Sequence, residues 1–432
     1  MIINKLSEIW ADSNKPFFIS EEKEIFFSEI HSINVEGIEK INAGDVVALI
    51  GDFNPKSILT FLKLIELKAI IVPITKDTIT QHNYFLKESK AQYLFEENKL
   101  TKIIKKDKVE HNLLKKIRDK NHPGIILFTT GTTGSPKAIL HDFIPFISRY
   151  DTPRPPLKAL SFLLFDHIGG LNTLLHMLFN KGTIVAIKER TVNKVLKLAE
   201  KYSIELLPTT PTFLRLLCLY PDLRIKFPKS IKIISYGTER LDEITLKVLC
   251  KELPDVDFRQ TYGMSELGIL RIKSLARDSL FMKVGGEGVE TKIINNILYI
   301  KAKNKMIGYL NSDSPFNKDG WYCTKDIVEK RDDNFLKIVG RDSDVINVGG
   351  LKFMPSEIEL ICLQFSNIKH VKAYGKANPI TGQHVELIVE PLNDGFSKLE
   401  LLNFLKLKLP KYMIPLKILI KEVSLSHRFK KI

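Results

Sequence analysis

Residues 124–140 read GIILFTTGTTGSPKAIL, an apolar strand that runs into a loop of Thr, Gly and Ser with a single Lys. Glycine lets a backbone approach its ligand closely, and the loop offers N–H groups, hydroxyls and an ammonium group as donors, which suits phosphate. The common P-loop is excluded, because Pro136 precedes Lys137 and Ala138 follows it. The segment therefore predicts a phosphate site of another kind, with a plain Gly/Thr turn as the alternative. Its predicted ligands are Thr129, Thr130, Gly131, Thr132, Thr133, Gly134, Ser135 and Lys137.

The segments around this loop alternate between strand and helix. Residues 46–50 are apolar, four apolar residues follow from Ile58 at the i, i+3, i+4, i+7 spacing of a helix, and residues 69–74 are apolar again. The same alternation returns at 183–187, in a helix capped by Thr191, and at 204–207 and 231–235. Successive β-α-β units predict mostly parallel, helix-covered sheets with ligand sites at the carboxyl ends of the strands.

The pattern changes beyond about residue 267, where short alternating stretches such as 289–294 and 297–302 predict antiparallel strands. Mixed α and β elements return after Gly340. A chain of 432 residues should contain two or three folding units. We therefore predict an α/β fold with a large multi-lobed N-terminal domain of residues 1–340, including an antiparallel β subdomain at about 268–340, and a small α+β C-terminal domain of residues 341–432.

Composition and charge narrow the class of protein. With 44% hydrophobic and 27% charged residues the chain is globular rather than disordered or fibrous. The net charge of +15 favours anionic ligands such as nucleotides and coenzymes. No cluster of Arg with aromatic residues is apparent, so a nucleic-acid partner is not predicted. The N-terminal residues show no secretory signal, and we expect a cytoplasmic protein.

The longest apolar stretch, residues 160–179, carries Asp166, His167 and a Gly pair, and this favours a buried core segment over a membrane span. The four cysteines are scattered without a CxxC pair, so neither a zinc site nor a disulfide framework is predicted. We interpret Cys218, Cys250, Cys323 and Cys362 as core thiols.

The phosphate loop resembles the signature loop of the adenylate-forming superfamily, which comprises acyl- and aryl-CoA synthetases, adenylation domains and luciferases. Further segments resemble that family's motifs in the expected order: FDHIGG (165–170), SYGTE (235–239), QTYGMSELG (260–268), GWYCTKD (320–326), GRDSDVINVGGLKF (340–353) and LPKYMIP (409–415). The resemblance spans nearly the whole chain and implies a nucleotide-binding N-terminal domain with a mobile C-terminal cap.

The resemblance implies a role for each matching nucleotide-site residue. Tyr262 would stack on adenine, Glu266 would hold Mg²⁺ because a hard cation prefers carboxylate oxygen, and Asp326 would accept hydrogen bonds from the ribose hydroxyls. Lys325 stands where the family commonly has Gly. The implied set also contains the adenine-edge residues Gly237, Thr238 and Glu239, the turn residues Gly263 and Ser265, and the nucleotide-contacting Arg341.

The resemblance also implies the catalytic residues. Residues 423–430 align with the pattern V-P-x-T-x-x-G-K, so Lys430 would bridge the substrate carboxylate and the α-phosphate of ATP. Lys431 is the rival, because Ser and Phe replace the usual Pro and Gly of the pattern. Thr130 and Glu266 complete the predicted catalytic set. Ser343 stands at the expected hinge, and His167 and Tyr236 would line the acyl pocket.

The resemblance implies ATP-dependent activation of a carboxylic acid to an acyl-adenylate, followed by acyl transfer to a thiol. The implied cofactors are ATP, Mg²⁺ and coenzyme A, and a medium-sized or aromatic acid is the expected substrate. A separate acyl carrier protein is the alternative acceptor. A catalytically weak nucleotide-binding relative is the alternative function.

Overall fold

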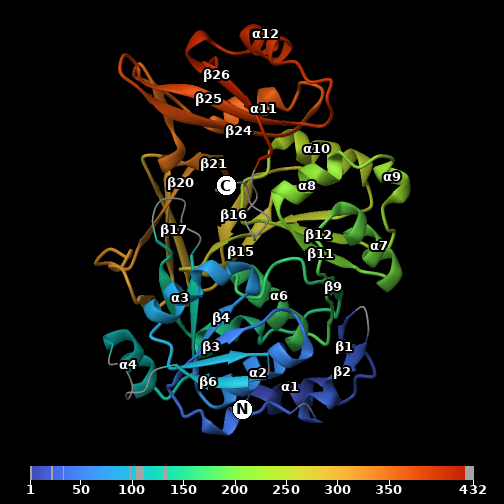
Figure 1. Cartoon of the computed structure of the whole chain (residues 1–432), viewed down its shortest axis with the longest axis vertical. Helices are drawn as coiled ribbons and strands as arrows, with labels where there is room; N and C mark the ends of the chain where they lie inside the picture. The colour runs from blue at the N-terminus through green and yellow to red at the C-terminus, as the bar shows by residue number, and fades with distance from the viewer. Residues whose placement is uncertain are drawn as a thin grey trace.

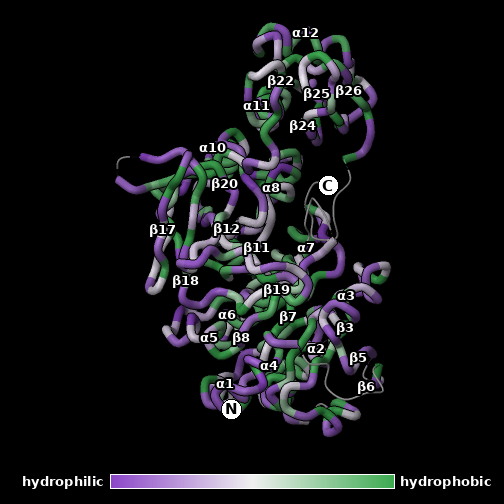
Figure 2. The backbone as a smooth tube through the Cα atoms, turned by 90° about the vertical axis from the view of Figure 1, so that its left-hand side faces the viewer, coloured by the Kyte–Doolittle hydropathy of each residue, from purple (hydrophilic) through white to green (hydrophobic). Residues whose placement is uncertain are grey.

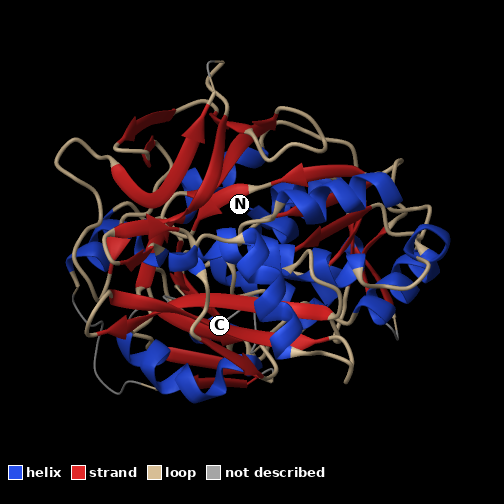
Figure 3. Ribbon diagram, turned by 90° about the horizontal axis from the view of Figure 1, so that it is seen from above, coloured by secondary structure: helices blue, strands red, loops and turns tan. Residues whose placement is uncertain are grey.

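The computed structural model describes residues 2–20, 23–32, 34–97, 99–103, 111–129, 135–331 and 333–423. The described strands form four sheets along the long axis of the molecule, with the N-terminal lobes at the bottom of Figure 1 and the C-terminal sheet at the top. Seen from above, helices lie between and beside layers of strands (Figure 3). This arrangement confirms the predicted α/β fold.

The phosphate loop belongs to a seven-stranded sheet in the order β19-β8-β7-β4-β3-β5-β6. The four strands β7-β4-β3-β5 are parallel, whereas β8, β6 and β19 are antiparallel to their neighbours. All residues of β3, β4, β7 and β8 are buried, as expected for a sheet covered on both faces. The elements of this lobe are α1 (Ile2–Trp10), β3 (Val46–Ile50), α2 (Pro55–Glu66), β4 (Ile70–Ile74), α3 (His82–Glu88), β5 (Tyr93–Glu96), β6 (Lys99–Lys102), α4 (Asn112–Asp119), β7 (Gly124–Phe128), β8 (Ala138–Asp142), α5 (Phe143–Ile147) and β19 (Gly308–Tyr309).

A second seven-stranded sheet has the order β13-β12-β11-β9-β10-β1-β2, and all of its pairs are parallel except β1-β2. Its elements are β1 (Pro16–Ile19), β2 (Glu24–Phe26), β9 (Lys158–Leu160), α6 (Ile168–Phe179), β10 (Thr183–Val185), α7 (Val192–Tyr202), β11 (Leu206–Thr209), α8 (Pro211–Cys218), α9 (Leu223–Lys226), β12 (Ile233–Tyr236), α10 (Glu243–Glu252) and β13 (Asp257–Gln260). β11 and β12 begin two residues later than predicted. Ser203 ends α7 in the left-handed conformation (φ 52°) and Ile204 N donates to Ala199 O at 2.9 Å, so Ile204 belongs to the helix cap.

The third sheet is the antiparallel β subdomain, in the order β14-β15-β16-β21-β20-β18-β17. Its strands are β14 (Tyr262–Met264), β15 (Gly268–Ser274), β16 (Met282–Gly285), β17 (Val289–Ile294), β18 (Ile297–Ala302), β20 (Tyr322–Lys330) and β21 (Leu336–Arg341). β17 and β18 have the predicted bounds. This sheet brings β14 and β21, which carry predicted nucleotide ligands, into one layer.

The C-terminal sheet has the order β23-β22-β25-β24, with β26 parallel to β25. Its elements are β22 (Ile346–Val348), β23 (Leu351–Phe353), α11 (Pro355–Cys362), β24 (Ile368–Asn378), β25 (Gly382–Pro391), α12 (Lys398–Lys408) and β26 (Lys417–Ile420). These elements share a hydrophobic cluster that contains no residue from before Ile346, and they lie at one end of the molecule (Figure 2). We propose on this ground that residues 341–432 form the separate cap domain.

The apolar stretch 160–179 forms part of the core, chiefly as α6, and ten of that helix's twelve residues are buried. Within the described ranges, the structure contains no helix long and apolar enough to cross a bilayer. All four cysteines are free thiols. Cys362 is buried, and Cys218 and Cys250 are half-buried and pack against a core cluster, as predicted. Cys323 is only half-buried, so its assignment to the core was wrong.

Candidate functional site

The phosphate loop leaves and re-enters its sheet through a narrow neck. Thr129 follows β7, and Lys137 precedes β8. Lys137 N donates to Thr129 Oγ1 at 3.0 Å, and Thr129 N donates to Lys137 O at 3.1 Å. The structure thus places two predicted phosphate ligands at the mouth of the loop. Ser135, also a predicted ligand, is exposed, whereas Thr130, Gly131, Thr132, Thr133 and Gly134 lie outside the described residues.

The exit from this loop is held by the segment around β19. Ala138 N donates to Asn311 Oδ1 at 2.9 Å, and Asn311 Nδ2 donates to Pro136 O at 3.0 Å. Tyr84 OH donates to the same Pro136 carbonyl at 2.9 Å. Backbone carbonyls of a loop need such partners when they are not paired in a sheet. The loop exit is therefore fixed from two directions.

Glu266 lies in the tight turn between β14 and β15. The turn requires Gly263, because a Cβ there would lie 2.5 Å from Gly268 O. The side chain of Glu266 is buried, and its Oε1 accepts a hydrogen bond from Tyr309 OH at 2.7 Å. Met306 N donates to Glu266 O at 2.8 Å. The strand segment that holds the loop exit therefore also holds the predicted magnesium ligand.

Ser265, which precedes Glu266 in this turn, is held by a hydrogen bond from a buried histidine. His141 Nε2 on β8 donates to Ser265 O at 2.6 Å, so Nε2 carries the proton. Burial lowers the pKa of His141 to about 4, although the hydrogen bond to Ser265 opposes this shift. His141 is therefore neutral at pH 7 and links β8 to the turn that carries Ser265 and Glu266.

Tyr309 on β19 is a site residue that the sequence did not reveal. Lys137 Nζ lies 4.7 Å from the centroid of its ring, while its hydroxyl donates to Glu266. Burial and the neighbouring Glu266 carboxylate raise the pKa of Tyr309, so its hydroxyl stays protonated. The two-residue strand has no periodicity, and only its position between other motifs could have drawn attention to it.

The predicted nucleoside ligands Tyr262, Asp326 and Arg341 contact one another. Tyr262 OH donates to Asp326 Oδ2 at 2.6 Å, and Arg341 Nε donates to Asp326 Oδ1 at 3.2 Å. Asp326 is buried, whereas the Arg341 side chain is 58% exposed and can reach a ligand. Burial raises the pKa of Asp326, and Arg341 and Tyr262 oppose this shift. A carboxylate has further acceptor positions, so both contacts are compatible with binding hydroxyl groups.

A bulge in β20 aims Asp326 at this cluster. Ile297 pairs with Ile327 but Tyr299 pairs with Cys323, so β20 has extra residues between these pairs. Thr324, which sequence reasoning did not select, donates to Leu298 O at 2.7 Å and accepts from Asp326 N at 3.0 Å. Bulges commonly redirect a side chain beside a functional site.

The predicted adenine-edge segment follows β12. A Cβ on Gly237 would lie 2.1 Å from Thr261 Oγ1, so the two strand ends pack too closely for any side chain. Thr238 has a φ of 72° and is exposed. Glu239 Oε2 accepts from Thr212 N at 3.2 Å and Thr212 Oγ1 at 2.7 Å, so its carboxylate binds the start of α8. Glu239 thus has a structural contact that the motif did not predict.

Tyr236 and His167, the predicted acyl-pocket residues, are both largely buried. Tyr236 is 2% exposed and belongs to the hydrophobic cluster shared by β11–β13 and their helices. His167 Nδ1 accepts from Gly169 N at 3.1 Å and caps α6. Their role in an acyl pocket stays a prediction. Lys430 and its rival Lys431 lie outside the described residues.

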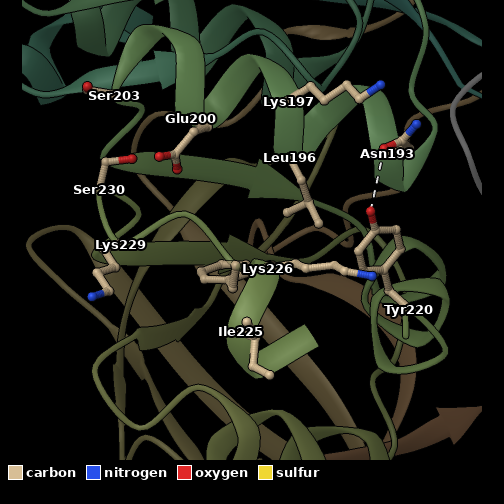
Figure 4. Close-up of a pocket in the computed structure, with 11 residues that line it drawn as sticks. Asn193, Leu196, Lys197, Glu200, Ser203, Tyr220, Ile225, Lys226, Lys229 and Ser230 are labelled. Atoms are coloured by element: carbon tan, nitrogen blue, oxygen red, sulfur yellow. Dashed lines mark hydrogen bonds between the residues drawn. The ribbon is translucent and has the colours of Figure 1, made fainter. Parts of the chain in front are cut away.

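A separate pocket of about 660 Å³ is lined by residues of α7 and α9 and of the segments beside them (Figure 4). Its lining combines both signs of charge, including Lys197, Glu200 and Lys229. It shares no residue with the predicted nucleotide site.

A family model and several curated proteins match this chain. The family model described as "AMP-binding enzyme" matches residues 37–297, more than half of the chain. A 2-succinylbenzoate–CoA ligase of Staphylococcus epidermidis is 28% identical over 312 residues, which are 68% of this chain and 64% of that protein. A medium/long-chain-fatty-acid–[acyl-carrier-protein] ligase of Mycobacterium tuberculosis is 28% identical over 58% of this chain and 53% of its own. The chain thus matches less than two thirds of the length of these relatives.

The solved structures share the fold. The o-succinylbenzoate CoA synthetase of Bacillus subtilis, solved with its acyl-adenylate intermediate, superposes with a TM-score of 0.78 at 19% identity. The match covers 99% of this chain and 96% of that one.

Proposed function

Because this chain belongs to the AMP-binding enzyme family, we propose that it is an AMP-forming acid–thiol ligase. In the first step a carboxylate oxygen attacks the α-phosphorus of ATP, the bond to the β-phosphate breaks, and pyrophosphate leaves. In the second step a thiol gives up its proton, its sulfur attacks the acyl carbon, and AMP leaves. Coenzyme A is the proposed thiol, with an acyl carrier protein as the alternative, because the relatives include ligases named for each acceptor.

The observation that carries this proposal is the meeting of Lys137 and Glu266 on Tyr309 at the mouth of the phosphate loop. The Lys137 ammonium would bind phosphate oxygens. In the described part of the chain Tyr309 is the one side chain that donates a hydrogen bond to the Glu266 carboxylate, and this leaves Oε2 for a cation. A carboxylate oxygen fits Mg²⁺, which when bound would neutralise phosphate charge.

The nucleoside would occupy the adjacent cluster. The hydrogen bond to Asp326 holds the Tyr262 ring in one orientation, and an oriented aromatic face suits a planar base. Asp326 would accept from the ribose hydroxyls, and Arg341 would contact the nucleotide. The Gly237 segment would border the adenine, with Thr238 and Glu239 beside it. The proposed loop ligands are Thr129, Thr130, Gly131, Thr132, Thr133, Gly134 and Lys137, with Gly263 and Ser265 in the opposing turn.

Lys430 would bridge the attacking carboxylate and the α-phosphate, and so lower the repulsion between two anions. The acyl group would lie near His167 and Tyr236. An aromatic acid is the first substrate to test, since relatives act on 2-succinylbenzoate by name.

A panel of aromatic, medium-chain and small carboxylic acids in a pyrophosphate-release assay tests the proposal. Each acid is assayed alone, with coenzyme A and with a phosphopantetheinylated carrier protein, and one acceptor should yield a thioester. Lys430→Ala should lose about 10²- to 10³-fold in pyrophosphate exchange while still binding ATP. Lys431→Ala is the matched control. ATP binding without pyrophosphate release for any acid would instead indicate a nucleotide-binding relative without activity.

A further inference from the structure

Tyr309 lies where the magnesium and phosphate sides of the proposed site meet, yet the reaction assigns it no part. It is 6% exposed, and two of its contacts reach opposite charges: the hydroxyl bonds the Glu266 carboxylate at 2.7 Å, and the ring faces the Lys137 ammonium at 4.7 Å. Aromatic faces attract cations, and a phenolic hydroxyl donates to anions. One side chain therefore serves both charged groups.

The backbone around Tyr309 is fixed on both sides. Tyr309 pairs with Ile139 of β8, and its neighbours extend the ladder through Ile307 N to Leu140 O at 2.8 Å and Leu310 N to Ala138 O at 2.9 Å. The ring therefore extends from a short strand that is fixed against β8, the strand that follows the phosphate loop.

The Tyr309 side chain contacts a cation through its ring and an anion through its hydroxyl, and these two groups attract each other. Lys137 is exposed and Glu266 is buried, and a direct pair between them would occupy the groups that the nucleotide and the cation need. Across the described part of the chain these two residues form no ion pair with each other, and each contacts Tyr309 instead.

We propose that Tyr309 is a positioning residue that keeps the Glu266 carboxylate and the Lys137 ammonium apart and available, one for a magnesium ion and the other for a phosphate. This inference rests on the proposed function. It predicts that the hydroxyl and the ring of Tyr309 act on different ligands, and two substitutions can separate them.

The test uses Tyr309→Phe, which keeps the ring, and Tyr309→Leu, which removes it. Binding of the non-reactive analogue α,β-methylene-ATP is measured by calorimetry with and without Mg²⁺, together with the Mg²⁺ dependence of pyrophosphate exchange. Tyr374→Phe is the matched control, because Tyr374 OH donates to Glu386 at 2.6 Å in the C-terminal sheet. This control removes the same kind of bond far from the site.

Tyr309→Phe should weaken the apparent Mg²⁺ affinity by about 10- to 100-fold, as expected when the partner of a metal ligand is lost. Its analogue binding without Mg²⁺ should match the wild type. Tyr309→Leu should also weaken Mg²⁺-free binding, by roughly 2- to 30-fold for a lost cation–π contact. The control should behave as the wild type in both measurements.

Wild-type Mg²⁺ dependence in Tyr309→Phe would overturn the inference and leave the proposed function intact. Equal losses of Mg²⁺-dependent and Mg²⁺-free binding in that variant would also overturn it, since they would indicate general damage. If the wild-type protein binds the analogue equally well with and without Mg²⁺, the proposed metal site is overturned, and the inference with it.

Discussion

Replacement of Gly237 by Ala tests the close approach of two strand ends at the proposed adenine edge. The added Cβ would lie 2.1 Å from Thr261 Oγ1 and 2.8 Å from Thr261 O. Thr261 cannot simply turn away, because its N and Oγ1 both donate to Tyr236 O, at 2.7 and 3.1 Å. Rotation of its side chain would break the second bond and still leave the backbone contact. The ends of β12 and β13 must therefore separate.

Such overpacking costs about 1–3 kcal/mol, so the free energy of unfolding should fall by that amount. If the overpacking raises the free energy of the AMP-binding conformation, each ~1.4 kcal/mol weakens binding tenfold. We therefore expect AMP to bind about 10-fold more weakly. Urea unfolding and calorimetric titration with AMP measure the two effects. Gly285→Ala is the control, because a Cβ there meets nothing within 4 Å. If Gly237→Ala matches this control in both assays, the strand ends are not in the contact described.

Further expected outcomes concern pH and backbone conformation. Burial lowers the pKa of His141 from an ordinary 6.5 to about 4. The buried neutral ring therefore makes its full contribution to the free energy of unfolding above pH 6.5, and this contribution is lost as the pH falls toward 4. The pH-dependent contribution of His141 amounts to about 3 kcal/mol. In urea unfolding between pH 4.5 and 7.5, His141→Gln should therefore show a smaller increase of the free energy of unfolding with pH than the wild type. The pKa of Asp326 is raised by burial, so its effect on stability has the opposite pH dependence. The contribution of its protonated form to the free energy of unfolding is complete below about pH 3.8 and is lost as the pH rises through the folded pKa. Asp326→Asn should therefore gain stability relative to the wild type between pH 4 and 7, and a pH-independent difference would contradict this. Lys325→Gly should change the free energy of unfolding by less than about 1 kcal/mol, because relief of left-handed strain offsets the added entropy of the unfolded chain. A larger loss in thermal or urea unfolding would contradict that balance.

The sequence predicted the motifs of the site better than their contacts with each other. Tyr262 and Asp326 are 64 residues apart and their hydroxyl and carboxylate touch, because β14 and β20 belong to one antiparallel sheet whose strand order no local pattern encodes. The helix cap Thr191 was readable from local chemistry, since a side-chain oxygen before an amphipathic run has few other uses. Strand ends were less readable, as the two-residue shift at β11 demonstrates.

Two residues escaped prediction for the same physical reason. Tyr309 and Thr324 act through partners distant in sequence, and each sits where the pattern is locally irregular: a two-residue strand in one case and a bulge in the other. Glu239 is the converse. Its motif indicated a ligand-side position, but its carboxylate binds the backbone and hydroxyl of Thr212, an interaction that depends on how α8 packs against the end of β12.

The bulge in β20 also explains why the departure from the family pattern at Lys325 does not disturb the cluster around Asp326. Lys325 adopts a φ of 60°, the conformation that glycine takes without strain, so the backbone path expected of a Gly is kept at a cost of roughly 1–2 kcal/mol. Thr324 secures that path by bonding both the neighbouring strand and Asp326 N. The fold therefore requires a left-handed backbone at position 325 but does not require a particular side chain there. Substitution of Thr324, which holds the bulge, should thus disturb Asp326 more than substitution of Lys325.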